Sequence, residues 1–312
     1  MNIRFFTIDQ NPPRWAAALQ KELPAARITL HPESPGVQAE YAVCWKPPAN
    51  FFDGQHNIKA VFNIAAGVEF ILAHPAMQEG YLREVPIVRL GDAGMAAQME
   101  EYVLAAALRW QRKLDAYAAQ QRAGEWKMLG PKKRDRVNVG VLGLGVLGAH
   151  VAQSMQRFGF SAAGWSRAPK QIEGIDCYAG ARGLGEMLAR TNVLVCLLPL
   201  TDSTLGILNR TNLAQLPPGA HLINIGRGAH LIESDLIALL DEGHLGGATL
   251  DVFAEEPLPA SNPLWKHPKV QITPHVSAST LRDESMAQIA AKIRVFETGE
   301  APGDVVDRNQ GY

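Results

Sequence analysis

The sequence predicts an α/β protein with two doubly wound parallel sheets. Short apolar runs alternate with longer helical patterns along almost the whole chain. This alternation is typical of parallel strands that are joined by helices. The chain of 312 residues exceeds the usual size of a single hydrophobic core, which favours two domains.

The first part of the chain begins with short strand patterns. The strands are expected at 3–8, 26–30, 41–45, 60–64 and 86–90, and a helix at 13–22. A long helical segment follows from 95 to 121, rich in the good helix formers Ala, Leu, Met and Gln. It ends in the polar stretch 124–136, which is typical of a boundary.

A second alternating series follows this polar stretch. Its strands are expected at 137–142, 161–165, 193–198, 220–225, 247–252 and 270–273, and a final helix at about 279–298. Most of the motifs that carry chemistry lie in this second series.

The charge balance argues against a nucleic-acid-binding protein. Lys and Arg total 30 against 31 Asp and Glu, and the one dense basic run, at 132–136, is interrupted by Asp135. We interpret that run as a solvated linker rather than a nucleic-acid patch. Hydrophobic residues at 47% and charged residues at 20% are ordinary for a folded globular protein.

Apolar runs and cysteine usage predict no membrane segment and a reducing compartment. The start has no signal-peptide pattern, and no apolar run approaches the ~18 residues that a membrane helix needs. Cys44, Cys177 and Cys196 are scattered and lack CxxC spacing, so neither a disulfide framework nor a metal site is predicted. The cytoplasm is the expected location.

The stretch GLGVLG predicts a dinucleotide-binding loop of the Rossmann type. Gly143, Gly145 and Gly148 directly follow an apolar strand and open a helical pattern, the context that this motif requires. The first glycine permits a tight turn, the second lets the backbone approach a pyrophosphate, and the third lets helix and strand pack closely. The helix start at Val146 and Leu147 then offers free N–H groups to the phosphates.

The residues after the strand expected at 161–165 favour NADPH over NADH. We expect NADH to bind more weakly. An NAD site usually carries an acidic residue about 20 residues beyond the glycines. Here Ser166, Arg167 and Lys170 occupy that region, and no Asp or Glu lies between 161 and 172. A hydroxyl and a guanidinium can bind a 2′-phosphate that a carboxylate would repel. The alternative is that Arg167 is a solvated loop residue.

Three polar residues follow successive strands of the second series. Arg227, Glu256 and His275 come after the strands expected at 220–225, 247–252 and 270–273. The carboxyl ends of parallel strands meet at one crevice, where the glycine loop also lies. Taken singly, these residues could be a surface charge, a loop carboxylate and a turn histidine. Their shared placement favours a site, and the glycines that flank Arg227 would leave room for a docking group.

The order of these motifs resembles the D-isomer-specific 2-hydroxyacid dehydrogenase family. The resemblance runs from about 99 to 298, through GLGVLG, LLPLTDSTLGILN, INIGRGAHLIESDLIALLDEGHLGGATLDVFAEEPLP and ITPHVSAST. Within the family, 41–48, 64–72, 92–103 and the closing RNQGY resemble the bacterial glyoxylate/hydroxypyruvate reductases of the A type. The resemblance implies a reductase that converts small 2-keto acids, glyoxylate and hydroxypyruvate above all, with NADPH.

The resemblance also implies roles for the three polar residues. Arg227 binds the substrate carboxylate and polarises the carbonyl, His275 donates the proton, and Glu256 orients and charges the imidazole. A planar guanidinium can hold a carboxylate in a fork. A carboxylate beside a histidine favours the imidazolium, which keeps an acid available for the developing alkoxide.

Further site residues are implied by the resemblance alone. Pro199 and Thr204 border the nucleotide, and Ile225 and Asp251 lie beside the cofactor. The backbone N–H groups of Ala66, Gly67 and Val68 complete the carboxylate pocket across an interdomain cleft. Trp45 is expected to form a wall of the pocket, with core packing as an equal alternative.

The family arrangement implies that the cofactor domain, 96–284, is inserted into a smaller flavodoxin-like substrate domain. Residues 1–95 build the substrate domain, to which 285–312 return. Homologues are commonly homodimers through the cofactor domain, so a homodimer is expected. The alternatives are a reductase of bulkier 2-keto acids and a nucleotide-sensing protein that resembles the corepressors of this family.

Overall fold

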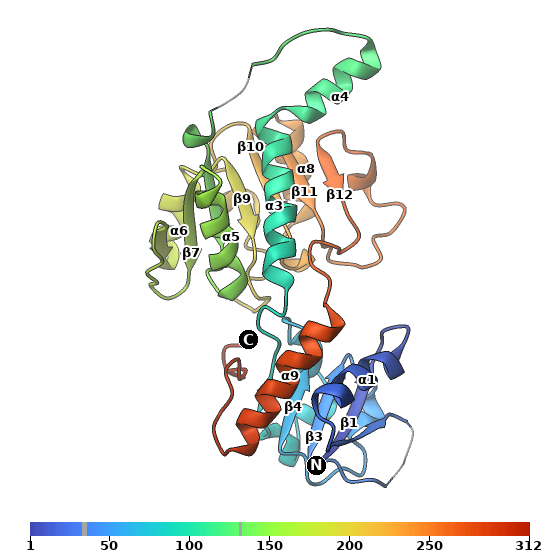
Figure 1. Cartoon of the computed structure of the whole chain (residues 1–312). Coiled ribbons are helices and arrows are strands. Elements are labelled where there is room, and N and C mark those ends of the chain that lie inside the picture. The colour runs from blue at the N-terminus through green and yellow to red at the C-terminus, as the bar shows by residue number, and fades with distance from the viewer. Residues whose placement is uncertain (33–35, 131–132) are drawn as a thin grey trace. The chain divides into compact units, whose positions relative to one another are not determined.

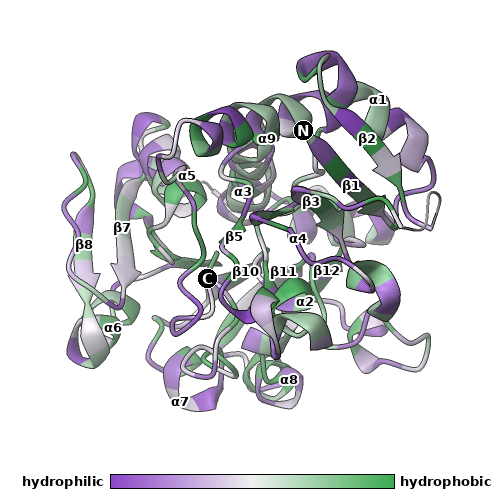
Figure 2. Ribbon diagram, turned by 90° about the horizontal axis from the view of Figure 1, so that it is seen from below, coloured by the Kyte–Doolittle hydropathy of each residue, from purple (hydrophilic) through white to green (hydrophobic). Residues whose placement is uncertain are grey.

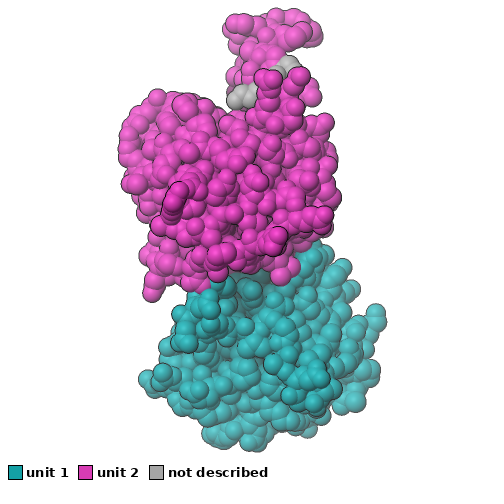
Figure 3. Space-filling view, turned by 90° about the vertical axis from the view of Figure 1, so that its left-hand side faces the viewer, with its two compact units in different colours: residues 1–94, 280–312 teal, residues 95–279 magenta. Residues whose placement is uncertain are grey.

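The computed structural model describes residues 1–32, 36–130 and 133–312 (Figure 1). These residues form two compact units, coloured separately in Figure 3: unit 1 contains residues 1–94 and 280–312, and unit 2 contains residues 95–279. The family resemblance implied the corresponding divisions after residues 95 and 284. Lys132, part of the basic run, lies outside the described residues, whereas Lys133 to Arg136 are exposed.

Unit 1 is a parallel sheet with the strand order β2-β1-β3-β4-β5. Its strands are β1 (Asn2–Thr7), β2 (Arg27–Leu30), β3 (Tyr41–Trp45), β4 (Ala60–Asn63) and β5 (Ile87–Val88). Its α-helices are α1 (Pro12–Glu22), α2 (Glu69–Leu72) and α9 (Arg282–Glu297). The order of the strands is that of a flavodoxin-like fold, with the topological switch between β1 and β3.

Side chains of both sequence ends build unit 1 together. Helices α1 and α9 lie side by side, and the Tyr41 ring of β3 meets Phe296 of α9 edge to face at 5.9 Å. An apolar cluster that includes Phe51, Ile71 and Met77 packs against Ala42, Cys44 and Val61 of the sheet. The C-terminal helix is therefore an integral part of the first unit.

Unit 2 is a second parallel sheet, with the strand order β12-β11-β10-β9-β6-β7-β8. Its strands are β6 (Asn138–Leu142), β7 (Ser161–Ser166), β8 (Asp176–Ala179), β9 (Val193–Cys196), β10 (Ala220–Asn224), β11 (Leu245–Leu250) and β12 (Val270–Ile272). Its α-helices are α3 (Met95–Gln111), α4 (Leu114–Ala123), α5 (Val146–Arg157), α6 (Gly180–Leu188), α7 (Arg210–Leu213) and α8 (Glu233–Asp241). The strand order reverses between β6 and β9, and the glycine loop follows β6 at this switch point.

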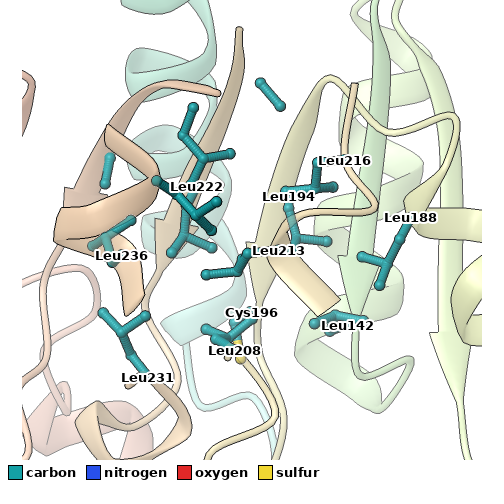
Figure 4. Close-up of a cluster of buried hydrophobic side chains, with 14 of the residues drawn as sticks. Leu142, Leu188, Leu194, Cys196, Leu208, Leu213, Leu216, Leu222, Leu231 and Leu236 are labelled. Carbon is teal, nitrogen blue, oxygen red and sulfur yellow. The ribbon is translucent and has the colours of Figure 1, made fainter. Parts of the chain in front are cut away.

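Helices cover both faces of the second sheet, because alternate strand residues point to opposite sides. Val139 and Val141 pack in a cluster with α3 and α5. On the other face, Leu142, Leu194 and Cys196 pack in a leucine-rich cluster with α6, α7 and α8 (Figure 4). Because only one side of each helix packs against the sheet, α5 and α6 are amphipathic, and both contain hydrophobic and hydrophilic residues (Figure 2).

The expected fold class, with two parallel-sheet α/β domains, is confirmed. Two local expectations are wrong. The helical segment 95–121 divides at Lys113, which has φ 57°: one face of α3 packs beside the sheet, whereas α4 has no buried residue. The polar stretch 124–136 is no division between units, since its described residues belong to unit 2. Strand β8 was not expected, because this edge strand has no alternating apolar pattern.

Candidate active site

The glycine loop has the geometry that a dinucleotide needs. Gly143 has φ +99°, and a Cβ there would lie 2.7 Å from the carbonyl oxygen of Leu197. A Cβ on Gly148 would lie 1.8 Å from the carbonyl oxygen of Gly143, so the helix could not pack against the strand. Nothing lies within 4 Å of a Cβ on Gly145. Two glycines are therefore required by packing, and the second faces open space.

Helix α5 begins directly after this open position. Gly145 is its N-cap in an extended conformation, without a capping side chain, and Val146 and Leu147 start the helix. The N–H groups of a first helical turn have no partner inside the helix, and the helix dipole favours negative charge there. The loop and the helix start fit a diphosphate.

The end of β7 brings hydroxyl and cationic groups close to the glycine loop. Ser166 ends the strand and donates its hydroxyl to the carbonyl oxygen of Ala168 at 2.8 Å. Arg167 is exposed, and the Lys170 ammonium donates to the carbonyl oxygen of Leu144, within the loop, at 2.6 Å. These groups fit a 2′-phosphate, and their contact with the cofactor stays a prediction.

The loop after β9 is held by its own side chains. Thr204 is buried; its hydroxyl donates to the Pro199 carbonyl at 2.7 Å and accepts from the Thr201 N–H at 2.8 Å. Ile225, after β10, is also buried, and its N–H donates to the Cys196 carbonyl at 3.3 Å. These residues shape the loops, and their contact with a nucleotide stays a prediction.

Glu256 and His275 form a close pair. His275 Nδ1 lies 2.8 Å from Glu256 Oε2, and both side chains are partly exposed. The other carboxylate oxygen of Glu256 accepts the N–H of Phe253 at 2.9 Å. The Phe253 N–H therefore holds the Glu256 carboxylate in place, and Nε2 of the imidazole is left to bind another group.

The His275 backbone has a left-handed conformation that non-glycine residues rarely adopt, with φ 57°. Asp251, which is completely buried at the end of β11, holds this turn. Its carbonyl accepts the N–H of His275 at 2.8 Å. Its two carboxylate oxygens accept the N–H groups of Val276 and Ser277, each at 2.8 Å. The strained turn is thus stabilised by one buried aspartate.

Tyr102 and Thr273 extend this network, and sequence reasoning missed both. The Thr273 hydroxyl lies 2.5 Å from Asp251 Oδ1 and 2.5 Å from the Tyr102 hydroxyl. Because the carboxylate can only accept, Thr273 donates to it and accepts from Tyr102. Burial raises the pKa of Tyr102, which keeps this hydroxyl a donor. Tyr102 lies on α3, far from Asp251 in sequence, so no local pattern indicates the contact.

Arg227 follows β10 in a tightly held turn. Its guanidinium donates to the Gly226 carbonyl at 2.7 Å, and its own carbonyl accepts from Asn224 at 3.1 Å. A Cβ on Gly228 would lie 1.8 Å from the carbonyl carbon of Phe253. The expectation that the flanking glycines leave room for a docking group is therefore wrong for Gly228, which is buried against protein backbone.

The same contact brings two loops of the site together. Gly228 touches the backbone of Phe253, and Phe253 donates to the Glu256 carboxylate. The turn of Arg227 therefore packs on the loop that orients His275. Both loops lie at the carboxyl edge of the sheet, as does the glycine loop after β6.

The predicted substrate residues Trp45, Ala66, Gly67 and Val68 belong to unit 1, at the carboxyl ends of β3 and β4. The Asn63 amide donates to the carbonyls of Ala65 at 3.0 Å and Gly67 at 2.7 Å, which fixes the loop. Within the described part of the chain, the N–H groups of Ala66 to Val68 have no hydrogen-bond acceptor. Successive free N–H groups suit a carboxylate, and this role stays a prediction.

Comparison with known proteins decides the family. The profile described as "D-isomer specific 2-hydroxyacid dehydrogenase, NAD binding domain" matches residues 104–277, more than half of the chain. The chain belongs to this family. The resemblance drawn from the sequence is confirmed, and the match lies within unit 2.

Similar family members cover the whole chain. A glyoxylate/hydroxypyruvate reductase A from Serratia proteamaculans is 45% identical over 100% of both chains, and one from Yersinia enterocolitica is 44% identical. A family structure from Xanthobacter autotrophicus, in complex with NADPH and MES, has a TM-score of 0.93 at 38% identity. It covers 100% of this chain and 99% of its own.

An NADPH-dependent glyoxylate/hydroxypyruvate reductase from Sinorhizobium meliloti, in complex with NADP and sulfate, has a TM-score of 0.90. The two sequences are 36% identical, and the match covers 100% of the chain described here and 99% of the Sinorhizobium meliloti chain. Over the described ranges, no group of three or more His, Cys, Asp or Glu could hold a metal ion. Nor is any described helix long and apolar enough to cross a membrane.

Proposed function

We propose that this protein is an NADPH-dependent reductase of small 2-keto acids, which converts glyoxylate to glycolate and hydroxypyruvate to D-glycerate. Full-length relatives at 43–45% identity are named glyoxylate/hydroxypyruvate reductase A. The observation that carries the proposal is the Glu256–His275 pair at the same sheet edge as Arg227 and the glycine loop.

The proposed cofactor site is built from unit 2. Gly143 to Gly148 and the start of α5 would hold the diphosphate, and Ser166, Arg167 and Lys170 the 2′-phosphate. The open space over Gly145 supports this assignment, because a side chain there would occupy the place of the diphosphate. Pro199, Thr204 and Ile225 are assigned to the nucleotide part of the site, whereas Asp251, whose buried carboxylate is bonded to the turn of His275, is assigned to the support of the site rather than to a contact with the cofactor. When bound, NADPH would supply the hydride for the carbonyl carbon of the substrate.

The protein's own residues bind the keto acid and supply the proton. Arg227 holds the carboxylate and stabilises negative charge on the carbonyl oxygen. His275 donates a proton from Nε2 to that oxygen, since its Nδ1 faces Glu256. Glu256 keeps the imidazole oriented, because its carboxylate is bonded to Nδ1. The products would be a 2-hydroxy acid, NADP⁺ and a neutral histidine, which regains its proton from solvent.

The test is the loss of reduced-nicotinamide absorbance in the purified protein. NADPH and NADH are each combined with glyoxylate, hydroxypyruvate, pyruvate and phenylpyruvate. We expect fast NADPH oxidation with glyoxylate and hydroxypyruvate and slow oxidation with NADH. Preferred turnover of phenylpyruvate would favour a reductase of bulkier acids. Binding of NADPH without turnover of any acid would favour a nucleotide-sensing interaction protein.

We further propose a homodimer. Helix α4 projects from the end of α3 (Figure 1), and none of its residues is buried. Trp126 and Met128, in the segment that follows, are almost fully exposed. Exposed large apolar side chains mark interaction surfaces, and a second copy is the proposed partner. Light scattering should show a dimer, and Trp126→Glu should shift it toward the monomer.

The proposed location is the cytoplasm. Cys44, Cys177 and Cys196 are free thiols, which fits a reducing compartment. Fractionation of cells that produce the protein should place the reductase activity in the cytoplasmic fraction. Recovery from an extracytoplasmic fraction would contradict this location.

A further inference from the structure

His230 is a completely buried histidine beneath the turn of Arg227. It ends the short 3-10 turn Gly228–His230, three residues after Arg227. The sequence analysis assigned no role to His230. A buried imidazole must satisfy both ring nitrogens, so its partners indicate what it does.

Both ring nitrogens have protein partners of defined type. Nδ1 lies 3.2 Å from the backbone N–H of Arg227 and 3.6 Å from the Cys196 thiol. Burial raises the pKa of Cys196 to about 12, so the thiol keeps its proton and is a donor. Nε2 lies 3.3 Å from the carbonyl oxygen of Pro199, which can only accept.

These partners select one protonation state. Nδ1 faces two donors and therefore accepts, whereas Nε2 faces an acceptor and therefore carries the proton. The neutral Nε2–H tautomer fits these contacts: the lone pair of Nδ1 accepts from the Arg227 N–H, with the weaker thiol donor beside it, and Nε2–H donates to Pro199. An Nδ1–H tautomer would place hydrogens against the Arg227 N–H and leave the Pro199 carbonyl without this donor.

The ring also bridges two loops to which different ligands are assigned. One side holds Arg227, assigned to the substrate carboxylate, and the other side holds Pro199, assigned to the nucleotide. A Cβ on Gly226 would lie only 3.3 Å from the ring, so the backbone before Arg227 packs directly on the imidazole. The Arg227 backbone is held on its other side by Asn224, through the Arg227 carbonyl.

We propose that His230 is a positioning residue for 2-keto acid binding: in its neutral Nε2–H tautomer it fixes the backbone of Arg227 and ties that turn to Pro199. The inference rests on the proposed function, in which Arg227 binds the substrate carboxylate. His230 itself touches neither substrate nor cofactor in this assignment, because its ring is fully enclosed by protein.

Three variants separate the two hydrogen bonds of the ring. His230→Asn keeps an acceptor near the place of Nδ1 and loses the donor to Pro199. His230→Gln keeps a donor near the place of Nε2 and loses the acceptor for Arg227. His230→Leu removes both. His221→Leu is the matched control, because His221 is another buried histidine of unit 2, bonded to Thr249 at 2.9 Å and placed in no site.

The KM for glyoxylate and the dissociation constant of NADPH are measured for each variant. Losing a buried hydrogen-bond partner should raise the glyoxylate KM about tenfold or more in His230→Leu and His230→Gln. We expect a smaller rise in His230→Asn, whose main defect should be weaker NADPH binding. A glyoxylate KM in His230→Leu that differs from the wild type no more than that of His221→Leu would overturn the proposal.

The tautomer is tested separately in the wild-type protein by ¹⁵N NMR of labelled histidines. An Nε2–H signal pattern for His230, assigned by its loss in His230→Leu, is expected at neutral pH. An Nδ1–H or doubly protonated ring would overturn the inference. This spectrum requires no turnover, so failure of the proposed reductase activity and failure of the His230 assignment are distinguishable.

Discussion

His275 Nδ1 lies 2.8 Å from Glu256 Oε2, and the second oxygen of Glu256 is bonded to the Phe253 N–H. This arrangement fixes which nitrogen of the imidazole is left for the substrate. His275→Ala should therefore lower turnover by about two to four orders of magnitude, the usual contribution of a general acid. NADPH binding should survive, and near-normal turnover would contradict the role.

Glu256→Gln tests the orienting carboxylate. The amide binds the Nδ1–H more weakly than a carboxylate does, so the imidazole is oriented less well and turnover should fall by roughly tenfold or more. Glu255→Gln is the matched control, since Glu255 is an exposed neighbour with no bond to His275 among the described contacts. Equal loss in both variants would indicate a general effect of charge at this loop.

Arg227→Lys tests the clamp on the substrate. A lysine keeps the charge but cannot offer the planar fork, so the KM for glyoxylate should rise and turnover should fall. Arg227→Ala should lower kcat/KM further. If both variants have the KM and the turnover of the wild type with glyoxylate, another residue binds the carboxylate.

Arg167→Ala tests the cofactor choice. Losing the guanidinium should lower kcat/KM for NADPH and leave that for NADH nearly unchanged, because only NADPH carries the 2′-phosphate. The measured quantity is the ratio of the two efficiencies. Arg182→Ala is a suitable control, since Arg182 is an exposed cation on α6 that pairs with Glu186. An unchanged ratio in Arg167→Ala would place the phosphate elsewhere.

Thr273→Val tests the network beneath His275. The variant removes the hydroxyl between Tyr102 and Asp251, so a buried carboxylate oxygen loses one of its donors. We expect a loss of about 1–3 kcal/mol in the free energy of unfolding. Turnover should also fall, because Asp251 holds the His275 turn. Thr249→Val, at the His221 bond, should destabilise the protein without this loss of turnover.

The sequence predicted the local motifs better than the long-range contacts. Gly143 and Gly148 could be found because a turn and a close helix approach leave a local glycine pattern. Tyr102 could not, because its partner Thr273 is distant in sequence, and His230 could not, because its partners Cys196 and Pro199 are distant and its contact with nearby Arg227 leaves no sequence pattern. Gly228 was found but explained wrongly: its neighbour Phe253 lies in the loop after the next strand, β11, and that packing has no signal in the sequence.

His221, at the start of β10, predicts a pH-dependent stability. Burial lowers the pKa of His221 to about 4, from the usual value of about 6.5. Above pH 6.5 the ring is neutral in both the folded and the unfolded chain and contributes no pH dependence. As the pH falls from 6.5 to 4, only the unfolded chain takes up the proton, so the folded state loses stability.

The full loss below pH 4 should reach about 3 kcal/mol in the free energy of unfolding, from the difference between the two pKa values. Denaturant unfolding of the wild type and of His221→Gln at several pH values measures it. The variant should show a shallower decline between pH 6.5 and 4, whereas His56→Gln, at an exposed histidine, should follow the wild type. Parallel curves for wild type and His221→Gln would mean that His221 is protonated in the folded state as readily as in the unfolded one.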